Sequence, residues 1–357
     1  MMKTQIGIGV LSIPSSFDTL GMAPGVICLM VIAIITTWAN YIVGVFKIRH
    51  PEVYGIDDVG FKLFGRWGRE IFAAIFILYW VFVAGSGILG LSISFNAMSA
   101  HGTCTAVFVV VSAIIGFLCG SIQTLGRISW LAWVGIVSIL AGVFTVTIAV
   151  GVEDRPAAAP KTPGPFISDW KVTKNPSFGD AMSAIATIIF AYSGAPGYFS
   201  IVAEMKNPRK HYVPSLMICQ FVMTAVYLTV GVVVYYYCGS YIASPALGSA
   251  SFLLKRVSYG LAFPGLVVST TLFVHVCNPS NPTAIFISLT LHQLPAKYIF
   301  VRALRGTRHL SSNTLQHWLF WFGCTAVLTL ISYIIASAIP VFSSLVSLIG
   351  ALFGKWL

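Results

Sequence analysis

Two stretches decide how the rest of the sequence should be interpreted: Gly7-Ile8-Gly9-Val10-Leu11-Ser12-Ile13-Pro14 and Phe190-Ala191-Tyr192-Ser193-Gly194-Ala195-Pro196. Each lies inside an apolar run that is long enough to form a helix. Glycine is a poor helix former and proline removes a backbone donor, so both stretches are predicted to unwind. In lipid, an unwound backbone is tolerated only where it lines a cavity or is buried in protein. The two stretches are therefore candidate functional positions of a membrane protein.

The composition of the whole chain supports this interpretation. Charged residues make up 9% of the 357 residues, hydrophobic residues 57%, and the mean hydropathy is +0.88. A soluble domain usually carries about 25% charged residues. The apolar runs are about 20 residues long, which is enough for a helix to cross a hydrocarbon core of roughly 30 Å. We predict an all-α polytopic protein with about ten spans, at 2–20, 23–46, 71–95, 105–122, 129–152, 181–203, 214–238, 258–276, 316–338 and from 340 onward.

The positive charge is distributed as in a multi-pass membrane protein. The net charge is +11, and most of the 21 Lys and Arg residues fall between spans on the side of the N-terminus. Cytoplasmic loops carry this excess, so the N-terminus is predicted to be cytoplasmic and no nucleic acid is needed to explain the charge. A proline-rich loop, 153–179, separates a first half, 1–152, from a second half, 180–357.

The positions of the two unwound stretches carry a functional prediction. They fall in spans one and six, the first of each set of five. Interrupted helices at corresponding positions of two inverted repeats are the best sequence pointer to a transporter's binding site. Half-helix N-termini can face a carboxylate, and freed carbonyls and hydroxyls can accept an ammonium group. The alternative is close packing, because glycine and proline are frequent in membrane helices, but the matched pair favours a site.

Several motifs resemble a known family. The segment 190–194, followed by Ala203-Glu204-Met205-Lys206-Asn207-Pro208-Arg209, resembles the sixth-span signature of the amino acid/auxin permease family. The segment 6–14 resembles its first-span signature. Segments 296–302 and 305–309 are similar to fungal neutral amino acid permeases of the Mtr type. The resemblance covers essentially the whole chain.

This resemblance implies a LeuT-like fold of two inverted five-helix repeats and secondary active transport of neutral or aromatic amino acids. Coupling to protons is usual in the fungal members, Na⁺ remains open, and no other cofactor is implied. The expected location is the plasma or vacuolar membrane. Glu204 maps to the inner end of span six, where it is expected to form part of a cytoplasmic gate rather than to bind the substrate. The substrate-binding residues that the resemblance implies are Gly7, Gly9, Ser12, Tyr192, Ser193 and Gly194.

Four further residues are weaker candidates. Tyr79 could close over a substrate through its hydroxyl, or could simply pack against Trp80. Ser269 and Thr270 on span eight could line a cation position, although such hydroxyls often bond their own helix backbone. His275 could carry a proton, because an ionisable group inside a membrane is a functional hypothesis by default. Because it lies near the cytoplasmic end of its span, a wetted interface residue is the alternative.

Other functional classes find less support in the sequence. An intramembrane enzyme is expected to have clustered His, Asp or Glu within its spans, and the sequence shows no such cluster. It also has no G-x-S-x-G nucleophile motif. No metal-ligand spacing stands out. An amino acid sensor that keeps the fold but does not transport remains an alternative that sequence cannot separate from a transporter.

The ends of the chain and one internal segment depart from the expected pattern. Few residues precede the first break, and the tenth span stops at Lys355-Trp356-Leu357. Segment 277–294 contains Asn278-Pro279-Ser280-Asn281-Pro282 and separates parts that fungal permeases join almost directly. We therefore expect a chain that is truncated at both ends and carries an insertion at 277–294, with a genuine species-specific loop as the alternative.

Overall fold

In the computed structural model, the described residues are 1–7, 9–53, 55–121, 129–160, 166–274, 299 and 315–354, and within them the chain is helical with no strand. The elements are α1 (Met2–Gln5), η1 (Gly9–Ser12), α2 (Ile13–Leu20), α3 (Met22–Arg49), α4 (Ile56–Met98), α5 (Thr105–Gly120), α6 (Ser129–Val152), α7 (Phe178–Tyr192), α8 (Ala195–Glu204), α9 (Pro208–Cys238), η2 (Gly239–Tyr241), η3 (Ala246–Gly248), α10 (Phe252–Val274), α13 (Leu315–Ala338) and α14 (Phe342–Phe353).

Apolar helices long enough to cross a membrane dominate the bundle. Among the described residues there are six such segments, and α5 and α14 are shorter apolar helices. The outer surface is also apolar: on α3, Ile34 and Trp38 are 65% and 64% exposed. A surface of this kind suits lipid rather than water. The prediction of an all-α polytopic membrane protein is confirmed at this level. The six segments are Met22–Arg49, Ile56–Met98, Trp133–Val152, Phe178–Phe199, Pro208–Tyr241 and Leu315–Ala338.

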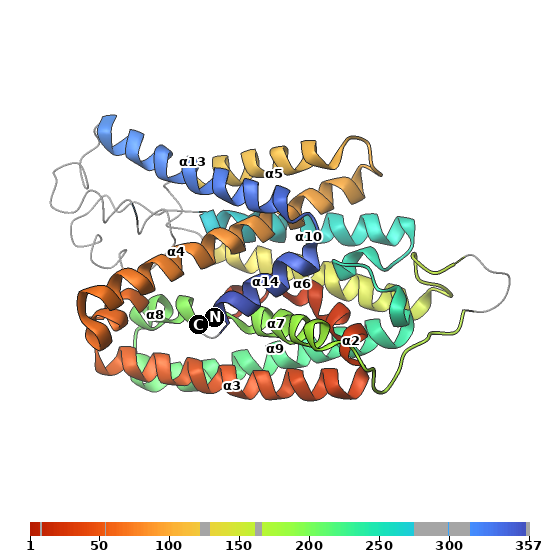
Figure 1. The fold of residues 1–357 in the computed structure, drawn as a ribbon, viewed down its shortest axis with the longest axis horizontal. Helices are drawn as coiled ribbons and strands as arrows, with labels where there is room; N and C mark the ends of the chain where they lie inside the picture. The colour runs from red at the N-terminus through yellow and green to blue at the C-terminus, as the bar shows by residue number, and fades with distance from the viewer. Residues whose placement is uncertain are drawn as a thin grey trace.

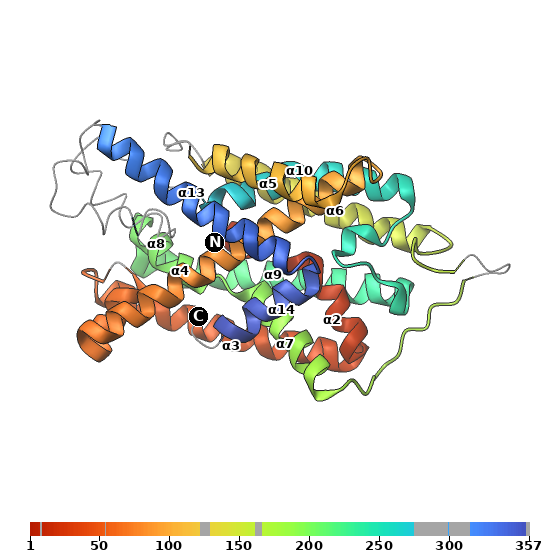
Figure 2. The same cartoon turned by 45° about the horizontal axis from the view of Figure 1, so that its top comes forward.

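The long helices run along the longest dimension of the molecule (Figure 1). In both views α5 and α13 lie along one edge (Figures 1 and 2), and in Figure 1 α3 lies along the opposite edge. The described parts of the connection between α6 and α7, 153–160 and 166–177, lie at one end of the bundle, which we call the loop end. Small residues let neighbouring helices approach closely. A Cβ added to Gly142 of α6 would lie 2.7 Å from the Ser258 carbonyl oxygen of α10, and Gly350 of α14 contacts the Ala186 carbonyl of α7.

Several helices begin earlier than the apolar runs predict. The third span was expected at 71–95, but α4 runs over Ile56–Met98 and changes direction at Gly65, whose φ of 65° suits glycine. The seventh was expected to start at 214, but α9 starts at Pro208, where a proline in the first turn costs no hydrogen bond. Hydropathy predicts only the part of a helix that lies in lipid, so it does not predict the polar turns with which these helices begin.

Both predicted interruptions are present. The first span divides into α1, η1 and α2, and the sixth divides into α7 and α8. Ser193 has φ −77° and ψ 67°, and the Gly194 N–H donates to the Tyr192 carbonyl at 2.8 Å, which is an inverse γ-turn. Prolines at the first turns of α2 and α8 help each helix to restart. Segment 277–294 and His275 lie outside the described residues, and the five-plus-five inverted repeat remains a prediction.

Candidate functional site

The two interruptions touch each other. Gly9 packs so closely on α7 that an added Cβ would lie 2.7 Å from the Ala191 Cα and 3.1 Å from the Ala191 Cβ. Two helices meet this closely only where a side chain is missing. Gly7 has more room, because the nearest atom to an added Cβ is the Ser269 Oγ of α10 at 4.0 Å. The first break therefore lies between α7 and α10.

Tyr79 of α4 connects the third helix to the second break. Its hydroxyl donates to the Ser193 carbonyl at 2.8 Å and lies 3.2 Å from the Ser193 Oγ. Its ring is 3% exposed and packs edge-on against Trp80 and against Phe353 of α14. The ring therefore packs as expected, and the hydroxyl contacts Ser193. The role of Tyr79 in closing over a substrate stays a prediction.

Tyr227 of α9 joins the two breaks, and the sequence did not single it out. Its hydroxyl lies 2.9 Å from both the Gln5 carbonyl and the Ala191 carbonyl, and its one proton can serve either oxygen. Gln5 ends α1, and Ala191 lies in the last turn of α7. The ring of Tyr192 packs edge-on against Tyr227, with centroids 5.1 Å apart. A tyrosine in an aromatic-rich apolar helix carries no sequence signal for such a bridge.

The predicted hydroxyls mostly bond nearby backbone. Ser12 donates to the Gly9 carbonyl at 2.9 Å, and Ser193 donates to the Phe190 carbonyl at 2.6 Å. On α10, Ser269 and Thr270 each donate to the carbonyl four residues earlier, at 2.8 and 2.9 Å. Such bonds satisfy carbonyls that an interrupted or bent helix leaves open. Of the two α10 residues, Ser269 is the one nearest to the first break.

Two of the remaining candidates, Tyr192 and Gly194, lie at the second break, and one, Glu204, lies beyond it. The Tyr192 hydroxyl donates to Thr224 of α9 at 3.1 Å, and the residue is 1% exposed. Gly194 is buried and precedes α8. Glu204 ends α8, ten residues beyond the break. Most of the predicted residues thus lie at or against the two breaks, whereas Glu204 is at the other end of α8; those at or against the breaks are Gly7, Gly9, Ser12, Tyr79, Tyr192, Ser193, Gly194 and Ser269.

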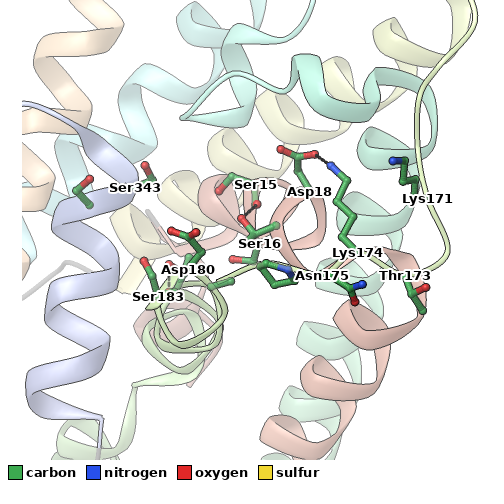
Figure 3. A pocket seen from close by; sticks show the side chains of 15 residues that line it. Ser15, Ser16, Asp18, Lys171, Thr173, Lys174, Asn175, Asp180, Ser183 and Ser343 are labelled. Atoms are coloured by element: carbon green, nitrogen blue, oxygen red, sulfur yellow. Dashed lines mark hydrogen bonds and ion pairs between the residues drawn. The ribbon is translucent and has the colours of Figure 1, made fainter. Parts of the chain in front are cut away.

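A polar hollow lies next to α2 and α7 (Figure 3). Its volume is about 790 Å³, and α2, α7, α14 and the segment 171–176 line it. Asp18 of α2 accepts a hydrogen bond from the Lys174 ammonium at 2.6 Å. Burial by itself would lower the pKa of Lys174, but the hydrogen bond and charge of Asp18 raise it above its usual value. Sequence reasoning missed this pair because nothing local links the two positions.

Segment 171–176 is held against the turn between α2 and α3 by its backbone. Met22 and Ala23 donate to the carbonyls of Lys171 and Val172 at 3.1 and 2.9 Å. Gly21, in the left-handed region with φ 93°, has no space for a Cβ because Thr173 and Lys174 lie against it. Asp169 accepts bonds from Ser240 beyond α9, and these lower its pKa although burial alone would raise it. The connection between α6 and α7 therefore contacts both the α2–α3 turn and the end of α9.

This fold and site define a class: a multi-pass helical membrane protein with two interrupted helices in contact inside the bundle. Within the described residues no group of His, Cys, Asp or Glu could hold a metal ion. The family model described as "Transmembrane amino acid transporter protein" matches residues 1–357, and the chain belongs to this family.

Three similar proteins have names that are consistent with membership of this family. The chain is 35% identical over 351 residues to a "Transmembrane transporter" of Gibberella moniliformis, covering 98% of this chain and 70% of the relative. It is 33% identical over 350 residues to the "N amino acid transport system protein" of Neurospora crassa, with the same coverage. It is 22% identical over 358 residues to the "Amino acid transporter AVT1J" of Arabidopsis thaliana, covering 97% and 75%. Membership of a transporter family is consistent with a non-enzymatic role.

Proposed function

We propose that this amino acid transporter family member is a secondary active transporter of neutral or aromatic amino acids, driven by a proton gradient. The observation that carries the proposal is the contact between the two interrupted helices at Gly9 and Ala191. Each break lets a new helix start inside the bundle, α2 after the first break and α8 after the second. Helix N-termini offer N–H groups and a positive dipole end to a substrate carboxylate.

The residues around the breaks support an uncharged substrate side chain. Neither sequence stretch, 7–12 or 190–196, contains a charged residue. A charged substrate side chain brought into this apolar interior would lack a partner, and burying an unpaired charge is costly. In this proposal Gly7, Gly9 and Ser12 present backbone and hydroxyl groups from the first span, and Tyr192, Ser193 and Gly194 do so from the sixth.

The surrounding helices close the site. Tyr79 holds the Ser193 carbonyl from α4, and Ser269 faces Gly7 from α10. A cation or proton position would then fall near Ser269 and Thr270, with His275 as the proton-carrying candidate. Glu204 would act at the inner end of span six. The proposal further places the two halves as inverted repeats in a LeuT-like arrangement, with the loop end outside and the N-terminus cytoplasmic in a plasma or vacuolar membrane.

The contact at Gly9 indicates how transport would proceed. While the first break is packed against α7, a substrate cannot enter a site between the two breaks. This packing must therefore alternate between a closed and an open arrangement. Two such packed states, each favoured on one side of the membrane, are what alternating access requires. The hydrogen bonds of Tyr79 and Tyr227 to the break carbonyls are the contacts that such a change would loosen.

Uptake into proteoliposomes tests the proposal. Labelled phenylalanine, leucine and lysine are supplied outside vesicles that contain the purified chain, with and without an inward proton gradient. We expect accumulation of phenylalanine and leucine but not lysine, collapse with a protonophore, and survival when sodium is replaced. Binding of phenylalanine without uptake under any gradient would refute transport.

The coupling residue has its own test. His275→Gln should reduce accumulation more than phenylalanine binding if this residue carries the proton. The matched control is His101→Gln, which changes an exposed histidine in the α4–α5 connection. Equal accumulation by both variants would remove His275 from the mechanism and leave the transporter proposal standing.

A further inference from the structure

Helices α6 and α10 run side by side and pack closely (Figures 1 and 2). A Cβ added to Gly265 of α10 would lie 2.6 Å from the Gly135 carbonyl oxygen and 2.5 Å from the Ile139 Cγ1 of α6. Two turns earlier in α10, the Ser258 carbonyl meets Gly142 in the same way. Missing side chains therefore bring the two backbones together over several turns.

Ser138 of α6 lies along this contact and bonds to α10 twice. Its Oγ accepts a hydrogen bond from the Gly265 N–H at 3.0 Å and donates to the Leu261 carbonyl. Leu261 and Gly265 are four residues apart, which is the pair that an uninterrupted helix joins by its own backbone bond. Pro264 lies between them, and a proline inside a helix bends it and loosens this bonding. One hydroxyl from the neighbouring helix thus bridges α10 at its bend.

Other hydroxyls of α6 behave differently. Thr145 and Thr147 each donate to the carbonyl four residues earlier in α6, at 2.7 and 2.8 Å. This is the usual behaviour of Ser and Thr in membrane helices. Thr145 is half-buried, as Ser138 is, so burial does not distinguish the two residues. What distinguishes Ser138 is that its partners belong to another helix.

The bend of α10 comes one turn before the residues near the breaks. The Gly265 carbonyl accepts the hydrogen bond of the Ser269 Oγ at 2.8 Å, and this Oγ is the atom that a Cβ on Gly7 would meet. Thr270 faces elsewhere, because its Oγ1 would lie 2.9 Å from a Cβ added to Gly87 of α4. Successive residues of a helix point about 100° apart, so the rotation of α10 after the bend decides which of them faces the first break.

We propose that Ser138 is a positioning residue for the site at the breaks. By bridging the Leu261 carbonyl and the Gly265 N–H, it holds α10 in the bend that directs Ser269 toward Gly7. Without the hydroxyl, the Gly265 N–H moves toward the Leu261 carbonyl, and the part of α10 after the bend turns. The expected effect on uptake rests on the proposed function, whereas the effect on the bend does not.

Disulfide formation reports the position of α10 without any transport. Cysteines introduced by Gly7→Cys and Ser269→Cys should cross-link under a copper–phenanthroline oxidant, because a Cβ on Gly7 lies 4.0 Å from the Ser269 Oγ. Mass spectrometry of the joined peptides distinguishes this bond from those of the native cysteines. Adding Ser138→Ala should slow the cross-link about tenfold, the effect of losing a hydrogen-bonded partner.

The matched control for the cross-link is Thr145→Val, which removes a half-buried hydroxyl that donates within α6. Added to the same cysteine pair, it should leave the rate unchanged. An equal rate in the Ser138→Ala and Thr145→Val proteins would overturn the proposal. So would a cysteine pair that does not cross-link when Ser138 is present.

Kinetics of phenylalanine uptake test the consequence for the site. Ser138→Ala should raise the KM about tenfold while the maximal rate stays within about twofold, because the protein folds but its site is displaced. Thr145→Val should keep the wild-type KM. A residue that only stabilises the contact between α6 and α10 would lower the maximal rate at constant KM, and that result would overturn the proposal. If the cross-linking is as expected but the wild type takes up no amino acid, it is the proposed function that fails.

Discussion

Substituting Gly9 by alanine tests the contact on which the proposed site depends. The new methyl group would lie 2.7 Å from the Ala191 Cα, 3.1 Å from its Cβ and 3.5 Å from its N. Carbon atoms in contact prefer about 3.5–4.0 Å, so the first break and α7 must separate by roughly 1 Å. The Ala191 Cα belongs to the backbone and cannot turn away as a flexible side chain would.

The magnitude follows from the cost of overpacking. Extra methyl groups in a well-packed interior cost about 1–3 kcal/mol. Because each 1.4 kcal/mol is a factor of ten, the closed packing should lose about 5- to 150-fold in population relative to arrangements in which the breaks are apart. Gly9→Ala should therefore lower both the thermal stability and the rate of phenylalanine uptake, while the protein still inserts into membranes.

Two control substitutions use the same chemical change. An added Cβ at Gly323 of α13 meets nothing within 4 Å, and one at Gly7 meets only the Ser269 Oγ at 4.0 Å. Gly323→Ala should leave stability and uptake unchanged, and Gly7→Ala should leave the packing unchanged. Melting temperature in detergent and initial uptake rates in proteoliposomes are measured for all three variants.

A second-site substitution sharpens the test. Ala191→Gly removes the Cβ at 3.1 Å but keeps the Cα at 2.7 Å, so it should rescue Gly9→Ala only in part. If Gly9→Ala matches Gly323→Ala in both stability and uptake, the two breaks are not packed as described and the reasoning fails. A complete rescue by Ala191→Gly would show that side-chain rather than backbone contact governs the approach.

Three further predictions concern the hydrogen bonds around the site and one exposed pair. Tyr227→Phe removes the one hydroxyl proton that the Gln5 and Ala191 carbonyls share and should cost about 1–3 kcal/mol of stability, measured by thermal unfolding. Tyr236→Phe on the exposed face of the same helix should cost less than about 0.5 kcal/mol. Tyr79→Phe should reduce phenylalanine uptake several-fold with little change in expression, because the Ser193 carbonyl loses its donor; uptake equal to the wild type would remove Tyr79 from the site. The bond from Lys62, the largest cause, lowers the pKa of Glu52 from 4.5 to about 2, so its contribution to stability is present above pH 4.5 and is lost as the pH falls toward 2. Glu52→Gln should therefore leave the pH dependence of uptake between pH 5 and 8 unaltered, and a shifted profile in that range would contradict this assignment.

The sequence by itself determined the class of the protein and the position of its interruptions. Apolar runs of about 20 residues with few charges can be stable only as helices in lipid, so all-helical architecture follows from hydropathy. Glycine and proline act on the backbone of their own segment, so the breaks near Gly7–Ser12 and at Ser193-Gly194 could be located without knowing any neighbour. Motifs in the same segments indicated the family, which the comparison with known transporters confirms.

Only the tertiary structure decided which groups meet at and near the breaks. Tyr227 reaches two carbonyls that are 222 and 36 residues away in the sequence, and Lys174 reaches Asp18 across 156 residues. Tyrosine or lysine in a helix or loop has no local pattern that reveals a distant partner, because such contacts depend on how helices cross. The close contact between Gly9 and Ala191 also depends on how the helices pack, because a missing side chain matters only once another backbone lies against it.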